Sequence, residues 1–160
     1  METITIKVLK KEVYEEVAKA TDYTGSKLIH SDDSARERIL AADDDLADLG
    51  RFWDETVLVA NESLKEMLVS GETKSAATET LGESIPAYVA VIEVSMSFDK
   101  ILTESVQSTI RSFFIASIIG QWFKFANKGE AGDYFAQAAD MMETAERLLY
   151  SRRKPSIPKD

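Results

Sequence analysis

The sequence predicts a mainly α-helical protein, a helical bundle of about four helices with a small two-stranded antiparallel β element. Three observations lead to this fold class. Long segments repeat apolar residues every three or four positions, which is the pattern of amphipathic helices. Two short segments instead alternate apolar and polar residues, as half-buried strands do. The chain has 160 residues and no cysteine, so it is long enough for one domain with an apolar core and cannot use disulfides.

The two alternating segments are expected to form the β element. In residues 3–8, the apolar Ile4, Ile6 and Val8 are interleaved with Thr and Lys. Residues 88–97 alternate in the same way and are rich in β-branched residues, which favour strands. Because a lone strand would leave its backbone groups unpaired, we expect these two segments to pair with each other.

The first predicted helix covers residues 10–20. Val13 and Val17 recur four positions apart among Lys and Glu residues, which gives a short apolar stripe. Gly25 is expected to stop this helix, because glycine readily adopts the left-handed conformation that ends many helices. The polar residues 26–34 are expected to form a loop that offers N-capping side chains to the next helix.

A second helix is expected from Ala35 to about Val69, with one break near residues 41–45. Its second part is strongly periodic, and the apolar stripe consists of Leu46, Leu49, Trp53, Val57, Ala60, Leu64 and Leu68. Gly71 is expected to end the helix. Residues 72–86 are rich in Glu, Thr, Ser and Gly, and we expect them to form a surface loop.

The third helix is expected from about Lys100 to Asn127, with Asp99 as its N-cap. Its second half is apolar over most of its surface, which predicts a central position in the fold. The most apolar run, residues 113–123, lies between two basic residues and is too short to span a bilayer. We interpret it as buried core.

The fourth helix is expected from about Glu130 to Ser151, because two prolines follow and prevent its continuation. The predicted buried side consists of Tyr134, Phe135, Ala138, Met141, Met142, Ala145, Leu148 and Leu149. The sequence therefore predicts a single helical domain over residues 1–151, followed by an extended basic C-terminal tail over residues 152–160.

Charge is unevenly distributed along the chain. The net charge is −9, which disfavours general binding to DNA or to an anionic membrane surface. Residues 151–160 carry four basic residues against Asp160, a net charge of +3, so the first 150 residues carry −12. An acidic body with a basic tip indicates a directional protein partner, or self-association of the tip of one copy with the body of another.

The groups that enzymes and metal sites need are scarce. The single histidine, His30, stands in a polar stretch with no catalytic partner nearby in the sequence. The acidic clusters at residues 32–33 and 43–48 lack the ligand spacing and distal Glu of a calcium loop, and we interpret them as helix starts. The glycines are isolated, so no phosphate-binding loop is indicated. We therefore predict no catalytic residue, no cofactor and no metal, and a protein that is not an enzyme.

The C-terminal segment is the candidate interaction site. Its prolines keep it extended, which lowers the entropy lost on docking, and its basic residues suit an acidic groove on a partner. The predicted docking residues are Tyr150, Arg152, Arg153, Lys154, Pro155, Ile157 and Pro158. Composition alone allows a frayed terminus with incidental charge equally well. We expect deletion of residues 152–160 to abolish docking and to leave the fold intact, because little apolar area is lost.

Four pieces of the sequence carry a resemblance to a known group of proteins. They are Ala20–Gly25, Leu49–Glu55, Gln121–Phe123 followed by Asn127–Ala131, and Leu149–Pro155. They run in order across nearly the whole chain, and together they resemble small structural proteins of tailed phages and prophages of gut Bacteroides-type bacteria. Proteins of this size and organisation in phage morphogenesis clusters resemble head–tail connector (adaptor) proteins.

That resemblance implies a virion structural protein. A connector of this kind forms a homo-oligomeric ring, here expected to be a dodecamer, between the portal protein and a tail or neck protein. DNA would pass the ring without specific binding and no membrane would be involved. The protein would reside in the host cytoplasm during assembly and then at the virion neck, with its C-terminal segment on a neighbouring ring component. Two alternatives stay open: a tail-completion or tail-terminator protein, and a phage regulatory or chaperone protein that is absent from the virion.

Overall fold

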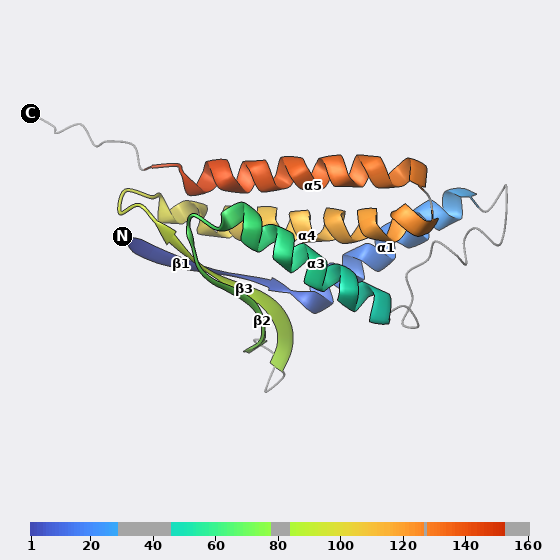
Figure 1. The fold of residues 1–160 in the computed structure, drawn as a ribbon, viewed down its shortest axis with the longest axis horizontal. Coiled ribbons are helices and arrows are strands. Elements are labelled where there is room, and N and C mark those ends of the chain that lie inside the picture. The colour runs from blue at the N-terminus through green and yellow to red at the C-terminus, as the bar shows by residue number, and fades with distance from the viewer. Residues whose placement is uncertain (29–45, 78–83, 127, 153–160) are drawn as a thin grey trace, which may run out of the picture.

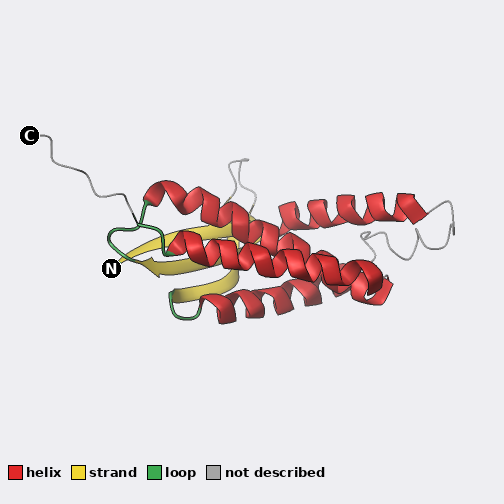
Figure 2. Ribbon diagram, turned by 90° about the horizontal axis from the view of Figure 1, so that it is seen from above, coloured by secondary structure: helices red, strands yellow, loops and turns green. Residues whose placement is uncertain are grey.

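The computed structural model describes residues 1–28, 46–77, 84–126 and 128–152. The elements in chain order are β1 (Glu2–Leu9), α1 (Lys10–Leu28), α3 (Leu46–Leu64), β2 (Leu68–Ala77), β3 (Ser84–Val94), the single 3-10 turn η2 (Lys100–Leu102), α4 (Thr103–Ala126) and α5 (Lys128–Leu149). The mainly helical fold class is confirmed, with four α-helices in the described part of the chain. Figures 1 and 2 agree that the sheet underlies only half of the helix layer, at the end that holds the N-terminus and the end of α5.

The predicted pairing of the two alternating segments is confirmed. β1 and β3 are antiparallel, with Ile4 opposite Ile92 and Val8 opposite Tyr88. All four of these side chains are buried, and the intervening Thr5 is exposed. The alternation of apolar and polar residues in the sequence therefore indicates which face of the sheet is covered by the helices, because the apolar side chains point to that face.

The sheet has a third strand that the sequence analysis missed. β2 pairs with β3 on the side opposite β1, so the strand order is β1-β3-β2 and the sheet is not two-stranded. The predicted helix to Val69 and the predicted loop from residue 72 were wrong, because α3 ends at Leu64 and residues 68–77 are extended. Leu68 happens to continue the four-residue spacing of α3. β2 contains few residues that favour strands, so its pairing with β3, rather than local propensity, makes it a strand.

The first helix also differs from prediction. α1 continues through Gly25 to Leu28 instead of stopping. A glycine inside a helix costs only about 1 kcal/mol relative to alanine, and α1 packs along α4. The remainder of the predicted loop and the first part of the predicted second helix, residues 29–45, lie outside the described residues.

The connection from the sheet to the central helix is close to the prediction. β3 ends at Val94, before the predicted residue 97, and the chain then turns. Asp99 is the N-cap as predicted, and its carboxylate accepts a hydrogen bond from the Ile101 backbone N–H at 3.2 Å. This cap opens η2, which runs directly into α4.

α4 lies in the middle of the molecule, as its sequence predicts. It packs against α5 on one side and against α1, α3 and β1 on the others (Figure 1). Its buried side chains are Val106, Ile110, Phe113, Phe114, Ala116, Ser117, Ile118, Ile119, Trp122 and Phe123. Among the helices of the described residues, none is long and apolar enough to cross a membrane.

An aromatic cluster joins α4 to its neighbours. The Phe114 ring lies between Trp53 of α3, at 4.9 Å between ring centroids, and Tyr88 of β3, at 5.1 Å. Trp53 also donates a hydrogen bond from Nε1 to Thr73 Oγ1 of β2 at 2.9 Å. Large aromatic side chains contribute the most buried apolar area per residue, so this cluster ties α3, α4 and the sheet together.

Gly71 allows α3 to approach the sheet closely. Asn61 of α3 donates from Nδ2 to the Gly71 carbonyl at 2.9 Å, and the Tyr88 hydroxyl donates to Asn61 Oδ1 at 2.7 Å. A Cβ atom at Gly71 would meet the Asn61 side chain and the Tyr88 hydroxyl, so only glycine fits here without a shift. The residue that the sequence analysis expected to end a helix is in fact the contact point of β2 with α3.

We predict that Gly71→Ala lowers the free energy of unfolding by about 1–3 kcal/mol, because the added methyl group overpacks a site that cannot yield without breaking these hydrogen bonds. Gly132→Ala is the matched control, since nothing lies within 4 Å of a Cβ at this exposed helical position. It should raise stability by about 0.5–1 kcal/mol. Urea denaturation measures both, and equal effects of the two substitutions would contradict the close approach.

Candidate functional site

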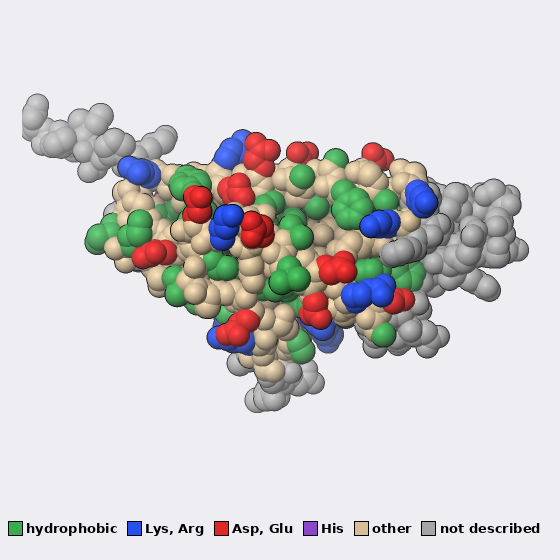
Figure 3. All heavy atoms as spheres, in the orientation of Figure 1, with side chains coloured by type: hydrophobic (Ala, Val, Ile, Leu, Met, Phe, Trp, Pro, Cys, Tyr) green, Lys and Arg blue, Asp and Glu red, His purple; other side chains and the backbone are tan. Residues whose placement is uncertain are grey.

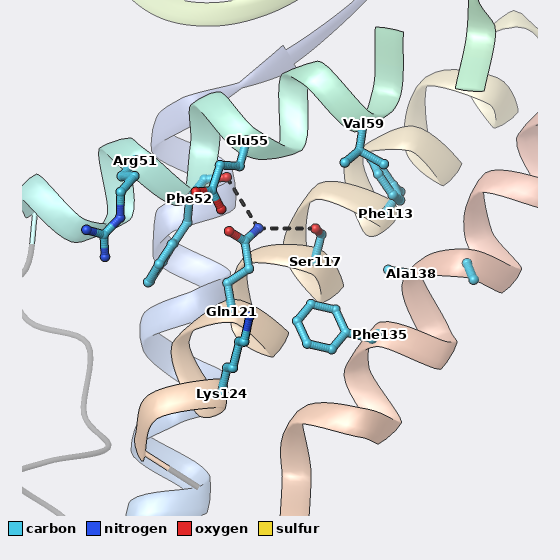
Figure 4. Close-up of a pocket in the computed structure, with 11 residues that line it drawn as sticks. Arg51, Phe52, Glu55, Val59, Phe113, Ser117, Gln121, Lys124, Phe135 and Ala138 are labelled. Atoms are coloured by element: carbon cyan, nitrogen blue, oxygen red, sulfur yellow. Dashed lines mark hydrogen bonds between the residues drawn. The ribbon is translucent and has the colours of Figure 1, made fainter. Parts of the chain in front are cut away.

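A groove lies between α3 and α5, with α4 as its floor (Figure 4). Its volume is about 640 Å³. It is lined by Arg51, Phe52, Glu55 and Val59 of α3, Phe113, Ser117, Gln121 and Lys124 of α4, and Phe135, Ala138 and Ala139 of α5. The walls therefore carry the apolar side chains of Phe52, Val59 and Phe135, whereas the α4 floor combines Phe113 with the polar Ser117 and Gln121.

The groove exists because α3 crosses α4 obliquely. In Figure 1, α3 and α5 approach each other at their C-terminal ends and diverge toward their N-terminal ends. At the converging end, Glu66 just after α3 and Tyr150 just after α5 border a smaller hollow. At the diverging end the two helices leave a wedge over α4, and this wedge is the groove.

Two apolar residues of α5 are less buried than predicted. Phe135 is 38% exposed and Met141 is 37% exposed, although both were expected on the buried side. The Phe135 ring lies over Gly120 of α4, where a Cβ would come within 3.0 Å of the ring. Gly120 thus makes room for Phe135 at the groove wall, and the opposite edge of that ring stays accessible from the groove.

A small polar network lies beneath the groove. Thr56 Oγ1 donates to the Phe52 carbonyl at 2.8 Å, and the hydroxyls of Thr56 and Ser117 are 3.2 Å apart. Gln121 Nε2 donates to Thr56 Oγ1 at 3.1 Å. It also donates to Ser117 Oγ at 3.4 Å and to the Phe52 carbonyl at 3.4 Å (Figure 4). Gln121 Oε1 is buried and accepts no hydrogen bond within the described part of the chain. The network links α3 to α4 and fixes the floor of the wedge.

Basic side chains predominate at the open end of the groove. Arg51 forms an ion pair with Asp48 at 3.4 Å and lies over the Phe52 ring at 5.4 Å. Lys124 at the end of α4 is exposed. Lys128 is exposed and precedes Phe135 by seven residues, so it lies on the same face of α5. Figure 3 shows basic side chains, with a few acidic ones among them, near that end of the molecule, although the chain as a whole is acidic.

A second feature is an exposed apolar surface at the opposite end, here called the apolar end. It comprises Met1, Met96, Ile101 and Tyr150, each more than half exposed. Their neighbours hold this end together, since Glu2 forms an ion pair with Lys100 at 3.3 Å. The backbone of Phe98 also pairs with that of Arg152 in an isolated antiparallel bridge. Figure 3 shows the hydrophobic side chains of this end on the surface.

The predicted docking residues are only partly within the described part of the chain. Tyr150 and Arg152 are exposed, and the backbone of Arg152 is bridged to that of Phe98 at the apolar end. Arg153, Lys154, Pro155, Ile157 and Pro158 lie outside the described residues. Those docking residues therefore stay predictions.

The candidates for catalysis and metal binding also lie mostly outside the described residues. This applies to His30 and to the acidic residues at 32–33 and 43–45. Asp48 is described and is paired with Arg51. The described residues contain no group of three or more His, Cys, Asp or Glu side chains that could hold a metal ion.

Two tyrosines have raised pKa values, and both belong to the core rather than to the groove. Burial, with a smaller contribution from the negative charge of Asp54, raises the pKa of Tyr14 to about 12. Burial also raises the pKa of Tyr88. The Tyr14 hydroxyl is buried without a hydrogen-bond partner among the described residues, whereas the Tyr88 hydroxyl donates to Asn61. The pKa shifts therefore report desolvation and not a proton-transfer site.

The groove and the apolar end were not identified from the sequence. A signal was present for the groove, because residues 57–60 are four consecutive apolar residues, more than one core-facing stripe of a helix needs. The sequence around Ile101 gave no such signal. Ile101 lies two residues after the predicted N-cap Asp99, where a side chain can face either the core or the solvent. Both surfaces present apolar side chains beside charged ones, which suits the binding of protein surfaces.

Comparison with protein-family models, with curated proteins and with solved structures found no match to this chain.

We predict that Thr56→Val lowers the free energy of unfolding by about 1–3 kcal/mol, because the Gln121 amide loses a buried acceptor. Thr109→Val is the matched control, since its hydroxyl donates only to the Ser105 carbonyl at an exposed site. The control should change stability by less than about 0.5 kcal/mol. Chemical denaturation compares the two, and a neutral Thr56→Val would show that the network contributes nothing to holding α3 on α4.

The two tyrosines should respond in opposite ways to loss of the hydroxyl group. Tyr14→Phe should be neutral or stabilising, because a buried hydroxyl without a partner is removed. Tyr88→Phe should cost about 1–3 kcal/mol, because Asn61 loses a buried donor. A folded-state pKa above the unfolded value near 10 means that stability falls as the pH rises above about 10. Tyr14→Phe should weaken that fall, which thermal unfolding between pH 8 and pH 11 measures; an unchanged pH dependence would contradict the assignment.

Proposed function

We propose that this chain is a non-enzymatic structural protein that assembles with copies of itself, and that it serves as a head–tail connector in the neck of a tailed phage. The interaction role is supported by the physical features of the surface. The connector role is supported by the resemblance of the four sequence pieces. The partners would be neighbouring copies in a ring, the portal protein above it and a tail or neck protein below it.

The observation that carries the interaction role is the apolar end. Monomeric soluble proteins seldom leave several large apolar side chains together on the surface, and such groups mark sites of protein association. Here Met1, Met96, Ile101 and Tyr150 are all more than half exposed. The N-terminal strand, η2 and the end of α5 present them together, at the point where the C-terminal tail begins.

The tail adds a charged contact to this apolar one. Arg152 begins the basic segment, and the rest of the chain carries a large excess of negative charge. A basic, proline-containing segment that docks on an acidic neighbour loses little conformational entropy and gains long-range electrostatic attraction. The tail thus serves to orient the next component, while the apolar end contributes most of the buried area.

The proposal predicts that the purified protein associates into closed oligomers and that it is a component of the virion. Mass photometry should detect a discrete ring species, and mass spectrometry of phage particles encoded by the same genome should detect the chain in several copies per particle. A tail-completion protein would be detected in the particle without a ring at the portal. A chain that stays monomeric at all concentrations and is missing from the particles would refute the proposal.

The role of the tail predicts a separate result. Truncation after Arg152 keeps the backbone bridge to Phe98 and removes only the segment beyond it, so thermal stability should not change. Binding to the neighbouring component should weaken by about tenfold or more, because the charge-complementary contact is lost. The control, Lys11→Gln with Lys19→Gln, removes two exposed positive charges from α1 and should leave binding intact. A large fall in melting temperature on truncation would show that the tail belongs to the core.

A further inference from the structure

The groove and the corner that contains η2 lie at opposite ends of the molecule. The η2 corner, residues 95–102, connects β3 to α4 and presents Met96 and Ile101 at the apolar end. Ile101 and Gln121 of the groove floor are separated by 20 residues of nearly continuous helix, about 30 Å at 1.5 Å per residue. One copy cannot place its own η2 corner in its own groove, whereas a second copy can.

The two surfaces match in apolar character. Ile101 is 85% exposed, the highest value among the large apolar side chains of the described residues. It projects from a single helical turn, and Met96 accompanies it. The groove offers the half-exposed Val59, at 51%, and the accessible edge of Phe135 above a floor that includes the buried Phe113. A protruding apolar side chain and an open apolar groove each lose water contacts on association.

The two surfaces also match in charge. Lys124 and Lys128 lie at the open end of the groove, where Glu55 is the acidic residue of the lining and Arg51 is paired with Asp48. At the η2 corner, Glu104 is exposed one turn after Ile101, and Asp99 and Glu93 precede it. Lys100 is paired with Glu2, and Arg152 reaches this corner through its backbone bridge to Phe98. Among the described residues, the three carboxylates of Glu93, Asp99 and Glu104 therefore outnumber the one further basic side chain. Opposite charges around an apolar contact favour one orientation of approach and oppose others.

We infer that the groove between α3 and α5 receives the η2 corner of a second copy of this chain, in a head-to-tail contact. This inference rests on the proposed self-assembly and specifies the two surfaces through which neighbouring copies would bind each other. The contact is heterologous, because each copy uses one surface for one neighbour and a different surface for the other. Such contacts repeat until the rotation between copies closes a ring, and they produce a filament if it does not close.

The test uses two variants, each with one surface disabled. Val59→Glu places a carboxylate in the groove, and Ile101→Glu places one on the η2 corner. Both side chains are at least half exposed in the monomer, so both variants should fold, which circular dichroism checks. Each variant alone should associate about a hundredfold more weakly than the original chain, since a buried, unpaired carboxylate opposes the contact. The matched controls are Leu58→Glu and Met141→Glu, which change exposed apolar residues outside the groove lining and should assemble normally.

Mixing the two variants is the decisive step. Ile101→Glu retains its groove and Val59→Glu retains its η2 corner, so a head-to-tail contact allows one interface and yields a one-to-one dimer that cannot grow. Native mass spectrometry with one variant labelled with nitrogen-15 identifies this mixed dimer. A mixture that stays monomeric, or variants that assemble like the original chain, would overturn the inference.

A charge exchange gives an independent check that does not depend on apolar substitutions. Lys124→Glu and Glu104→Lys should each weaken association by about tenfold, and the two combined in one chain should restore it. Additive weakening in the combined variant would contradict the pairing. If the original chain does not associate at all, the proposed function fails as well. If it associates but none of these variants responds, only the head-to-tail contact is wrong.

Discussion

The burial of α4 is the constraint on which the rest of the molecule depends. The second half of this helix is apolar on nearly all sides, so the free energy of folding is favourable only if neighbours cover that half all round. α5 packs antiparallel along one side of α4, and α1, α3 and the N-terminal strand pack against it from the other directions (Figure 1). No short segment could do this alone, which explains why elements from both halves of the sequence converge on α4.

The position of α3 is a compromise between two partners. Toward the sheet it uses Asn61, which contacts Gly71 and Tyr88, and toward α4 it uses Thr56, which contacts Ser117 and Gln121. Satisfied polar groups in a buried setting fix one arrangement more sharply than apolar packing does, because any shift leaves a group unpaired. The oblique crossing that results leaves the groove uncovered toward α5. A surface suited to a partner therefore arises from the same contacts that hold the fold together.

Much of the helical layout could be predicted from the sequence, because long amphipathic periods and an N-cap such as Asp99 are local signals. The pairing of β1 with β3 could also be predicted, since the alternation identifies both strands and each needs a partner. β2 could not, because Ser, Thr, Lys and Gly in this segment resemble a loop and become a strand only through pairing with β3. α1 passes Gly25 for a related reason, since its packing on α4 outweighs a small local cost.

The surfaces were harder to predict than the core. Periodicity identifies which face of a helix is buried, but the exposure of Phe135 depends on the angle at which α3 crosses α4, and that angle is set by contacts between distant residues. Ile101 is exposed because it lies on η2, where the chain turns from the sheet into α4. A three-residue turn is too short for a hydrophobic period that would show which side of it is buried. The basic character of the C-terminal tail, by contrast, could be predicted from composition alone. Composition does not identify the partner to which the tail binds.

Chemical cross-linking between lysines tests the head-to-tail contact most directly. Lys100 at the η2 corner and Lys124 or Lys128 at the groove are separated within one chain by most of the length of α4, about 36 Å for its 24 residues. A short amine-reactive cross-linker cannot span this distance along the helix, so any such link must join two copies. We predict links from Lys100 to Lys124 and Lys128 between labelled and unlabelled chains in the assembled protein. Links that join only equivalent surfaces of two copies, or none between copies, would contradict a head-to-tail assembly.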